Sequence, residues 1–99
     1  MGKVIFSIKY EIKPEKKNEY LTIMKELKNL IKSEVISDYK VFEHQSKKNT
    51  FEEIYFFESE DAYENWDDVQ NERVELLMKK LSDTIKEQTT EYSRLYEID

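Results

Sequence analysis

Residues 50–66 read TFEEIYFFESEDAYENW and contain a strand followed by the start of a helix. The segment from Thr50 to Glu58 is rich in aromatic and β-branched residues, which favour strands. Ser59 is a good helix N-cap, and the acidic residues after it complement the positive end of a helix. Because apolar side chains occupy both odd and even positions of this strand, we predict that both of its faces are apolar.

The rest of the chain supplies three more strands and a long helix. From Val4 to Ile12, apolar and polar residues alternate with a period of two, which predicts a strand. We expect a helix from Pro14 to Ser33, and strands at Tyr39–Gln45 and Thr89–Ile98. In the helix that follows Ser59, the helical spacing of the apolar residues is interrupted near Asn71, so we expect a kink or a break there.

The order strand, helix, strand, strand, helix, strand predicts a ferredoxin-like α+β fold. In this fold four antiparallel strands form one sheet, and both helices cover the same face of it. A chain of 99 residues supports one compact core, so residues 1–99 are expected to form a single domain.

Composition excludes several classes of function. There is no cysteine, which rules out disulfides, thiolate catalysis and thiolate metal sites. A net charge of −6 argues against nucleic acid and against anionic membrane surfaces as partners. No stretch resembles a signal peptide or a spanning helix, so we expect a cytoplasmic protein.

The hairpin around residues 46–49 decides which side chains share a face. A turn of even length would place Tyr39, Val41, Ile54 and Phe56 together, and we expect this face to meet the helices. The opposite face would then carry Lys40, Phe42, His44, Phe51, Glu53, Tyr55 and Phe57. Helices can cover only one face, and large exposed apolar patches are uncommon. We therefore predict a homodimer through the sheet; the alternative is that the second face stays in water.

Residues 53–66, at the end of the third strand and the start of the next helix, carry a resemblance to a known family at five positions: Glu58, Ser59, Ala62, Tyr63 and Trp66. With the element order, they make the chain similar to the dimeric α/β barrels that include antibiotic-biosynthesis-type monooxygenases. The resemblance implies a dimer with a pocket between sheet and helices or inside the barrel. It also implies a small organic ligand, and oxidation of an aromatic or quinol-type substrate without a cofactor.

Two branches of that family differ from this sequence. The haem-degrading branch has an asparagine where Ser7 stands and a histidine where Leu76 and Leu77 stand, so haem degradation is not predicted. The quinol-oxidising branch often has histidine where Trp66 stands. A non-catalytic binding or assembly module is therefore the alternative to an enzyme.

Three residues are candidates for catalysis. His44 is the only histidine and could act as a general base. In the expected register it lies near Glu53 and Tyr55, and together the three groups could handle protons. The alternatives are an idle, half-exposed histidine and a cross-strand charge pair of Glu53 with Lys40 or His44.

Five further residues are candidates for ligand binding. Trp66 could stack on a flat ligand, or it could simply anchor the core. Ser7 and Lys9 lie on the less apolar face of the first strand and could line a pocket or face a partner. Phe42 could line the pocket, and Arg94 on the last strand could contact an anion. No metal site and no cofactor are predicted, since one histidine without thiolates makes a poor metal site.

Overall fold

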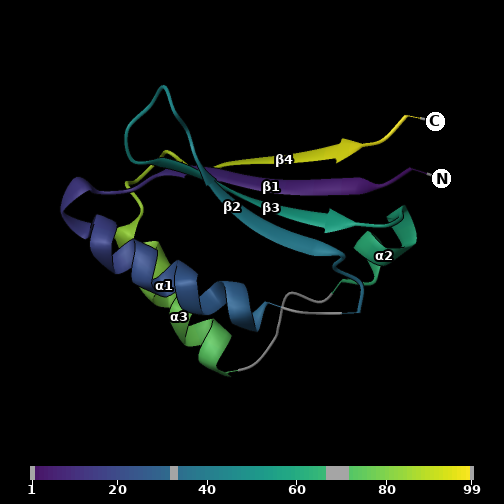
Figure 1. The fold of residues 1–99 in the computed structure, drawn as a ribbon, viewed down its shortest axis with the longest axis horizontal. Coiled ribbons are helices and arrows are strands. Elements are labelled where there is room, and N and C mark those ends of the chain that lie inside the picture. Colours follow the sequence, from purple (N-terminus) through teal and green to yellow (C-terminus); the bar gives the residue numbers. More distant parts are fainter. Residues whose placement is uncertain (1, 32–33, 67–71, 99) are drawn as a thin grey trace.

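The fold is a four-stranded antiparallel sheet with helices on one face, as predicted (Figure 1). A computed structural model of the chain describes residues 2–31, 34–66 and 72–98. The strand order is β2-β3-β1-β4. The elements are β1 (Val4–Glu11), η1 (Pro14–Lys16), α1 (Lys17–Leu30), β2 (Asp38–Glu43), β3 (Thr50–Phe57), α2 (Glu60–Glu64), α3 (Glu72–Thr84) and β4 (Glu91–Tyr96).

The second helical region is broken, in agreement with the interrupted spacing of its apolar residues. Ser59 caps α2 as expected, because its side-chain oxygen accepts a hydrogen bond from the backbone N–H of Ala62 at 3.1 Å. The new helix α3 begins at Glu72. Asn71, the expected position of the break, lies outside the described residues, as does Ser33 at the expected end of the first helix.

The register of the β2–β3 hairpin differs from the predicted one. Tyr39 lies opposite Tyr55, and the backbone N–H of His44 donates to the carbonyl of Thr50 at 2.8 Å. The turn therefore spans residues 45–49, an odd number, and Asn49 adopts a φ of 61° that asparagine tolerates well. A shift of one residue moves every side chain of β3 to the other face relative to β2. Tyr39 and Val41 therefore meet the helices as predicted, but the predicted placement of the β3 side chains was wrong, because Ile54 and Phe56 lie on the outer face.

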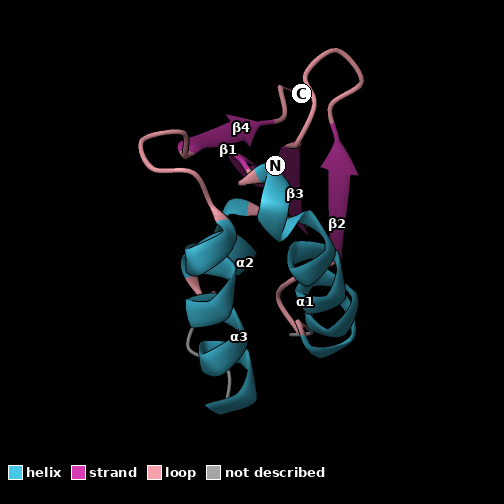
Figure 2. Cartoon of the chain, turned by 90° about the vertical axis from the view of Figure 1, so that its left-hand side faces the viewer, coloured by secondary structure: helices cyan, strands magenta, loops and turns pink. Residues whose placement is uncertain are grey.

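The face of the sheet that meets the helices is built from β1 and β3. Its side chains are Val4, Phe6, Ile8, Tyr10, Phe51, Glu53, Tyr55 and Phe57. Under them α1 and α3 lie side by side (Figure 2). The helices contribute Tyr20, Leu27, Leu77 and Leu81 to the same core. Burial of this apolar layer is the main driving force for the fold.

The outer face of the sheet has an apolar end and a charged end. Ile5 lies opposite both Phe56 and Leu95, and the side chain of Leu95 is 59% exposed. Further along β1, Lys9 lies opposite Glu52 and Glu91. Both faces of β3 are thus apolar, as the sequence predicted, but Phe51 and Phe57 belong to the core and not to the outer face.

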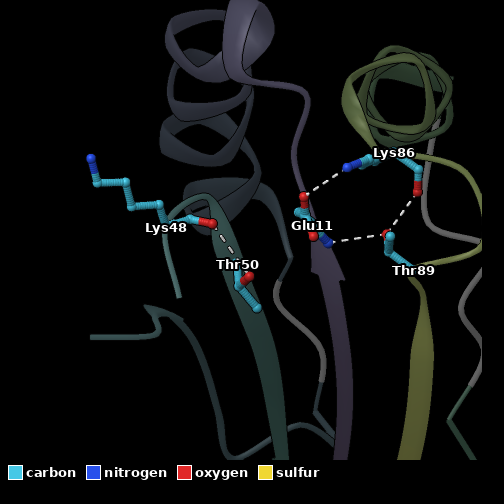
Figure 3. Close-up of polar contacts among 5 residues, drawn as sticks. All are labelled: Glu11, Lys48, Thr50, Lys86 and Thr89. Atoms are coloured by element: carbon cyan, nitrogen blue, oxygen red, sulfur yellow. Dashed lines mark hydrogen bonds and ion pairs between the residues drawn. The ribbon is translucent and has the colours of Figure 1, made fainter. Parts of the chain in front are cut away.

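Polar contacts fasten the end of β1 to the segment before β4 (Figure 3). The backbone N–H of Glu11 donates to the hydroxyl of Thr89 at 3.1 Å, and that hydroxyl donates to the carbonyl of Lys86 at 2.6 Å. The ammonium of Lys86 lies 3.2 Å from the carboxylate of Glu11. On the neighbouring strand the hydroxyl of Thr50 donates to the carbonyl of Lys48. The contacts of Glu11 thus connect the end of β1 to the segment between α3 and β4, whereas the Thr50 contact lies in the turn between β2 and β3.

Candidate ligand site

A cavity of about 240 Å³ lies between the sheet and the helices. The described residues of its wall come from β1, β3, α3 and β4 and from the segments just after α1 and α2; they are Phe6, Ile8, Ile31, Tyr55, Trp66, Met78 and Tyr92. The volume is slightly below the usual range for drug-sized ligands, and the lining is mostly apolar and aromatic. The cavity therefore suits a small, flat organic molecule.

The aromatic rings of the wall contact one another. The ring centroids of Tyr55 and Trp66 are 5.0 Å apart, and those of Phe6 and Trp66 are 5.8 Å apart. Phe6 also stacks on Tyr92, with ring planes 15° apart. Tilted and offset contacts at these distances are favourable for aromatic pairs. The wall is therefore a connected aromatic surface.

The indole N–H of Trp66 is the notable polar group at this wall. Its Nε1 atom is buried and has no hydrogen-bond partner within the part of the chain that the structure describes. Leaving a buried donor unpaired costs about 1–3 kcal/mol. Because protein atoms cover Nε1 in this conformation, a ligand acceptor in the cavity would recover that cost after a local shift of the side chains around Trp66.

A buried carboxyl group lies one step further along β3. Glu53 is 3% exposed, and its two oxygens accept hydrogen bonds from the hydroxyls of Tyr10 at 2.6 Å and Tyr39 at 2.7 Å. The hydroxyl of Tyr20 lies 2.9 Å from that of Tyr10. Distances this short are typical of hydroxyls that donate to a carboxylate.

Burial dominates the ionisation of this network. It raises the pKa of Glu53, and the hydrogen bonds from Tyr10 and Tyr39 oppose that rise. Burial also raises the pKa of Tyr10, Tyr39 and Tyr20, and the nearby Glu53 carboxylate raises it further. The three phenols therefore stay protonated at physiological pH and remain available as donors.

The expected cluster of His44, Glu53 and Tyr55 does not form. Glu53 and Tyr55 share one face, as predicted, but this is the face that meets the helices and not the opposite face as expected. His44 lies on the outer face, where its Nε2 is 3.1 Å from Glu52. The contact expected between His44 and Glu53 is thus replaced by a hydrogen bond between His44 and Glu52. The cause is the odd-length turn, which places His44 and Glu53 on opposite faces.

The other predicted ligand-binding residues are also scattered. Trp66 lines the cavity, just after α2. Ser7, Lys9 and Phe42 lie on the outer face, so they do not line the cavity between sheet and helices. Arg94 lies on the helix side, with its guanidinium 5.9 Å from the ring centroid of Tyr63.

The sequence reasoning missed most of the cavity and all of the partners of Glu53. Tyr10 belongs to the alternating apolar face of β1, and that pattern could have placed it beside Glu53 had the hairpin register been correct. Met78 and Tyr92 were not singled out as candidates for ligand binding. Among the described residues no group of three potential ligands could hold a metal ion, and no helix there is long and apolar enough to cross a membrane.

A larger hollow of about 490 Å³ runs between α1 and β2. Its rim includes Lys25, Lys28 and Glu43, which are exposed, and hydrated charges of this kind usually mark a solvent-facing groove. The smaller cavity at Trp66 is therefore the better candidate site.

Solved structures with the same architecture include proteins provisionally assigned as antibiotic biosynthesis monooxygenases. One of them, from Caulobacter crescentus CB15, superposes with a TM-score of 0.80 and 11% identity, covering 99% of this chain and 92% of that one. SnoaB, a cofactor-independent oxygenase from Streptomyces nogalater, gives a TM-score of 0.70 and 12% identity, covering 94% and 90%. This chain shares their fold.

A conserved protein from Methanosarcina mazei Go1 is also similar, with a TM-score of 0.76, 19% identity, and coverage of 96% and 92%. No protein-family model matches the chain, and no curated protein is similar to it in sequence. The predicted likeness to antibiotic-biosynthesis-type monooxygenases is thus confirmed for the fold, and one fold can host many activities.

Proposed function

We propose that this protein binds a small, flat organic molecule in the cavity at Trp66 and oxidises an aromatic or quinol-type substrate without a cofactor. The observation that carries the proposal is an aromatic cavity whose one buried indole N–H lacks a partner among the described residues. A quinol or phenol fits this wall because it offers a flat apolar ring and an oxygen acceptor.

In such a reaction the substrate itself supplies the electrons. One atom of O₂ enters the ring and the other leaves as water, so the substrate is oxidised by two electrons more than simple hydroxylation requires. The Trp66 N–H would donate to an oxygen of the substrate on which negative charge develops, and the dry aromatic wall would strengthen that interaction. The shape of the cavity would hold the ring in one orientation.

A non-catalytic binding module is the alternative, and one observation favours it. Among the described residues, those that line the cavity include two phenols but no carboxylate and no imidazole, so this part of the wall offers no obvious general base. Ligand binding without consumption of oxygen would support this alternative.

Binding and turnover can be measured separately. Calorimetric titration with a panel of monocyclic and bicyclic quinols, quinones and phenols measures affinity, and an oxygen electrode measures turnover. The variant Trp66→Phe keeps an aromatic ring but lacks the N–H, and it should weaken binding by about 2–12-fold, the value of one hydrogen bond. Leu76→Ala, at a 44% exposed position of α3, is the matched control and should change nothing.

Failure of the whole panel to bind would overturn the ligand site. Equal affinity of the wild type and Trp66→Phe would show that the N–H does not hold the ligand. Oxygen uptake that requires the substrate and disappears in Trp66→Phe would support the monooxygenase.

The proposal includes a homodimer formed by the outer faces of two sheets. Leu95 and Phe42 are 59% and 49% exposed there, and Ile5 and Phe56 border a hollow of about 410 Å³ beside Leu95. A second copy would bury these apolar groups. The proposal also keeps the cytoplasmic location expected for a chain without cysteine.

Sedimentation velocity of the wild type and of Leu95→Glu tests the dimer. A wild type that sediments as a dimer at micromolar concentration, with a variant that sediments as a monomer, is the expected result. A monomeric wild type would contradict it.

A further inference from the structure

Aromatic rings connect the wall of the cavity to the buried carboxyl group. The ring of Trp66 is 5.0 Å from that of Tyr55, and Tyr55 is 4.7 Å from Tyr39, centroid to centroid. The hydroxyl of Tyr39 donates to Glu53 at 2.7 Å. The chain of contacts therefore begins at the ligand cavity and ends at a proton acceptor.

Each end of this series of aromatic contacts has a property that one-electron transfer needs. Oxidation of a tyrosine is easy only if its phenolic proton can leave, and Glu53 already accepts the hydrogen bond along which that proton would move. At the other end, the buried N–H of Trp66 has no acceptor among the described residues. An oxidised indole there would keep its proton and remain a cation, which is the more strongly oxidising form.

We infer that Trp66, Tyr55, Tyr39 and Glu53 form a path that carries an oxidising equivalent from the cavity to Tyr39. A one-electron oxidant in the cavity, such as an organic radical, takes one electron from Trp66. Tyr39 then returns one electron to Trp66 through the ring of Tyr55 and transfers its phenolic proton to Glu53. The oxidant is reduced by one electron, and the products in the protein are a neutral Tyr39 phenoxyl radical and a protonated Glu53.

The surroundings favour storage of the radical at Tyr39. Tyr39 is 8% exposed and Glu53 is 3% exposed, so small reductants in solution have little access to either. Tyr10 also donates to Glu53, at 2.6 Å, and holds the carboxyl group in position. The path goes beyond the proposed ligand site and does not depend on what the cavity binds.

Pulse radiolysis tests the path directly, because the chain has only one tryptophan. Azide radicals generated in a dilute solution of the whole protein oxidise the indole, and the measurement is repeated at rising pH because ionisation of Glu53 supplies the proton acceptor. The expected result is a first-order decay of the indolyl absorption, matched by growth of the phenoxyl absorption, with a rate that is independent of protein concentration. An indolyl signal that decays without any phenoxyl growth would overturn the inference.

Variants locate the end of the path. Tyr39→Phe should abolish the first-order phase, and Glu53→Gln should slow it by about a hundredfold or more, since the proton loses its acceptor. Tyr63→Phe is the matched control, because Tyr63 is also near Trp66, at 6.4 Å between ring centroids, and it should leave the rate unchanged. Circular dichroism checks that each variant is folded.

Loss of the phase in Tyr63→Phe together with a normal rate in Tyr39→Phe would overturn the assignment to Tyr39. If Tyr39→Phe does not fold, Glu53→Gln alone decides: an unchanged rate would refute the role of the carboxyl group.

Discussion

Replacing Tyr39 with phenylalanine removes one hydroxyl from the buried network and leaves the ring in its place. In the wild type this hydroxyl donates to Glu53 at 2.7 Å, and Glu53 is 3% exposed. Hydrogen bonds to a charged partner contribute about 1.5–3 kcal/mol, so Tyr39→Phe should lower the free energy of unfolding by about that amount. For a chain of this length each kcal/mol lowers the melting temperature by about 4–8 °C.

The effect of Tyr39→Phe should depend on pH in a defined direction. The Tyr39 hydrogen bond stabilises the ionised form of Glu53, so its loss raises the pKa of that carboxyl group further above its usual range. The difference in stability between wild type and variant should therefore be larger at neutral and alkaline pH. It should shrink as the pH falls and Glu53 becomes protonated in both proteins.

Urea unfolding followed by circular dichroism, between about pH 5 and pH 8, measures both effects. Tyr96→Phe is the control, because Tyr96 is 51% exposed, and it should stay within about 0.5 kcal/mol of the wild type. Equal losses in the two variants, or a Tyr39→Phe loss that is the same at every pH, would refute the description of Glu53 as a buried carboxylate held by phenols.

Substitutions at three positions, Glu53, Ser59 and Gly2, test further features of the structure. Burial raises the pKa of Glu53 in the folded state above its value in the unfolded chain. The wild type should therefore lose stability as the pH rises from the unfolded-state pKa to the folded-state pKa, because the buried carboxyl group ionises less readily than the exposed one. Glu53→Gln cannot ionise, so urea titrations at several pH values should show that it gains stability relative to the wild type over that range. Ser59→Ala should cost about 1 kcal/mol in the same assay through loss of the α2 cap, whereas Ser59→Asp should retain it. In Gly2→Ala the added Cβ would overlap the backbone carbonyl of Glu97, so thermal unfolding should show a loss of about 1 kcal/mol.

Patterns of alternation and capping were enough to predict the fold. Val4 to Ile12 alternates cleanly, and Ser59 with its acidic followers marks a helix start, because these signals depend on neighbours along the chain. The interrupted spacing of the apolar residues likewise predicted a break in the second helix. Each of these features is local, and each is present in the structure.

The site could not be predicted because it depends on one long-range parameter, the register of β2 against β3. The choice between an even and an odd turn rests on Asn49, which adopts a left-handed conformation that the sequence permits but does not require. Because we predicted a turn of even length, we placed His44 beside Glu53 and did not predict the hydrogen bonds that Glu53 accepts. Trp66 was found because its position follows from the adjacent helix, without any reference to the sheet.

The strand β4 has a consequence for how a ligand reaches the cavity. It is an edge strand, and among the described strands it pairs with β1 alone; all residues of β4 are exposed. Tyr92 belongs both to β4 and to the cavity wall, so transient detachment of this strand would open the cavity while α1 and α3 stay packed. Access is then governed by the local opening equilibrium of one strand, and a bound ligand should slow amide hydrogen exchange in β4 more than in β1 or β3.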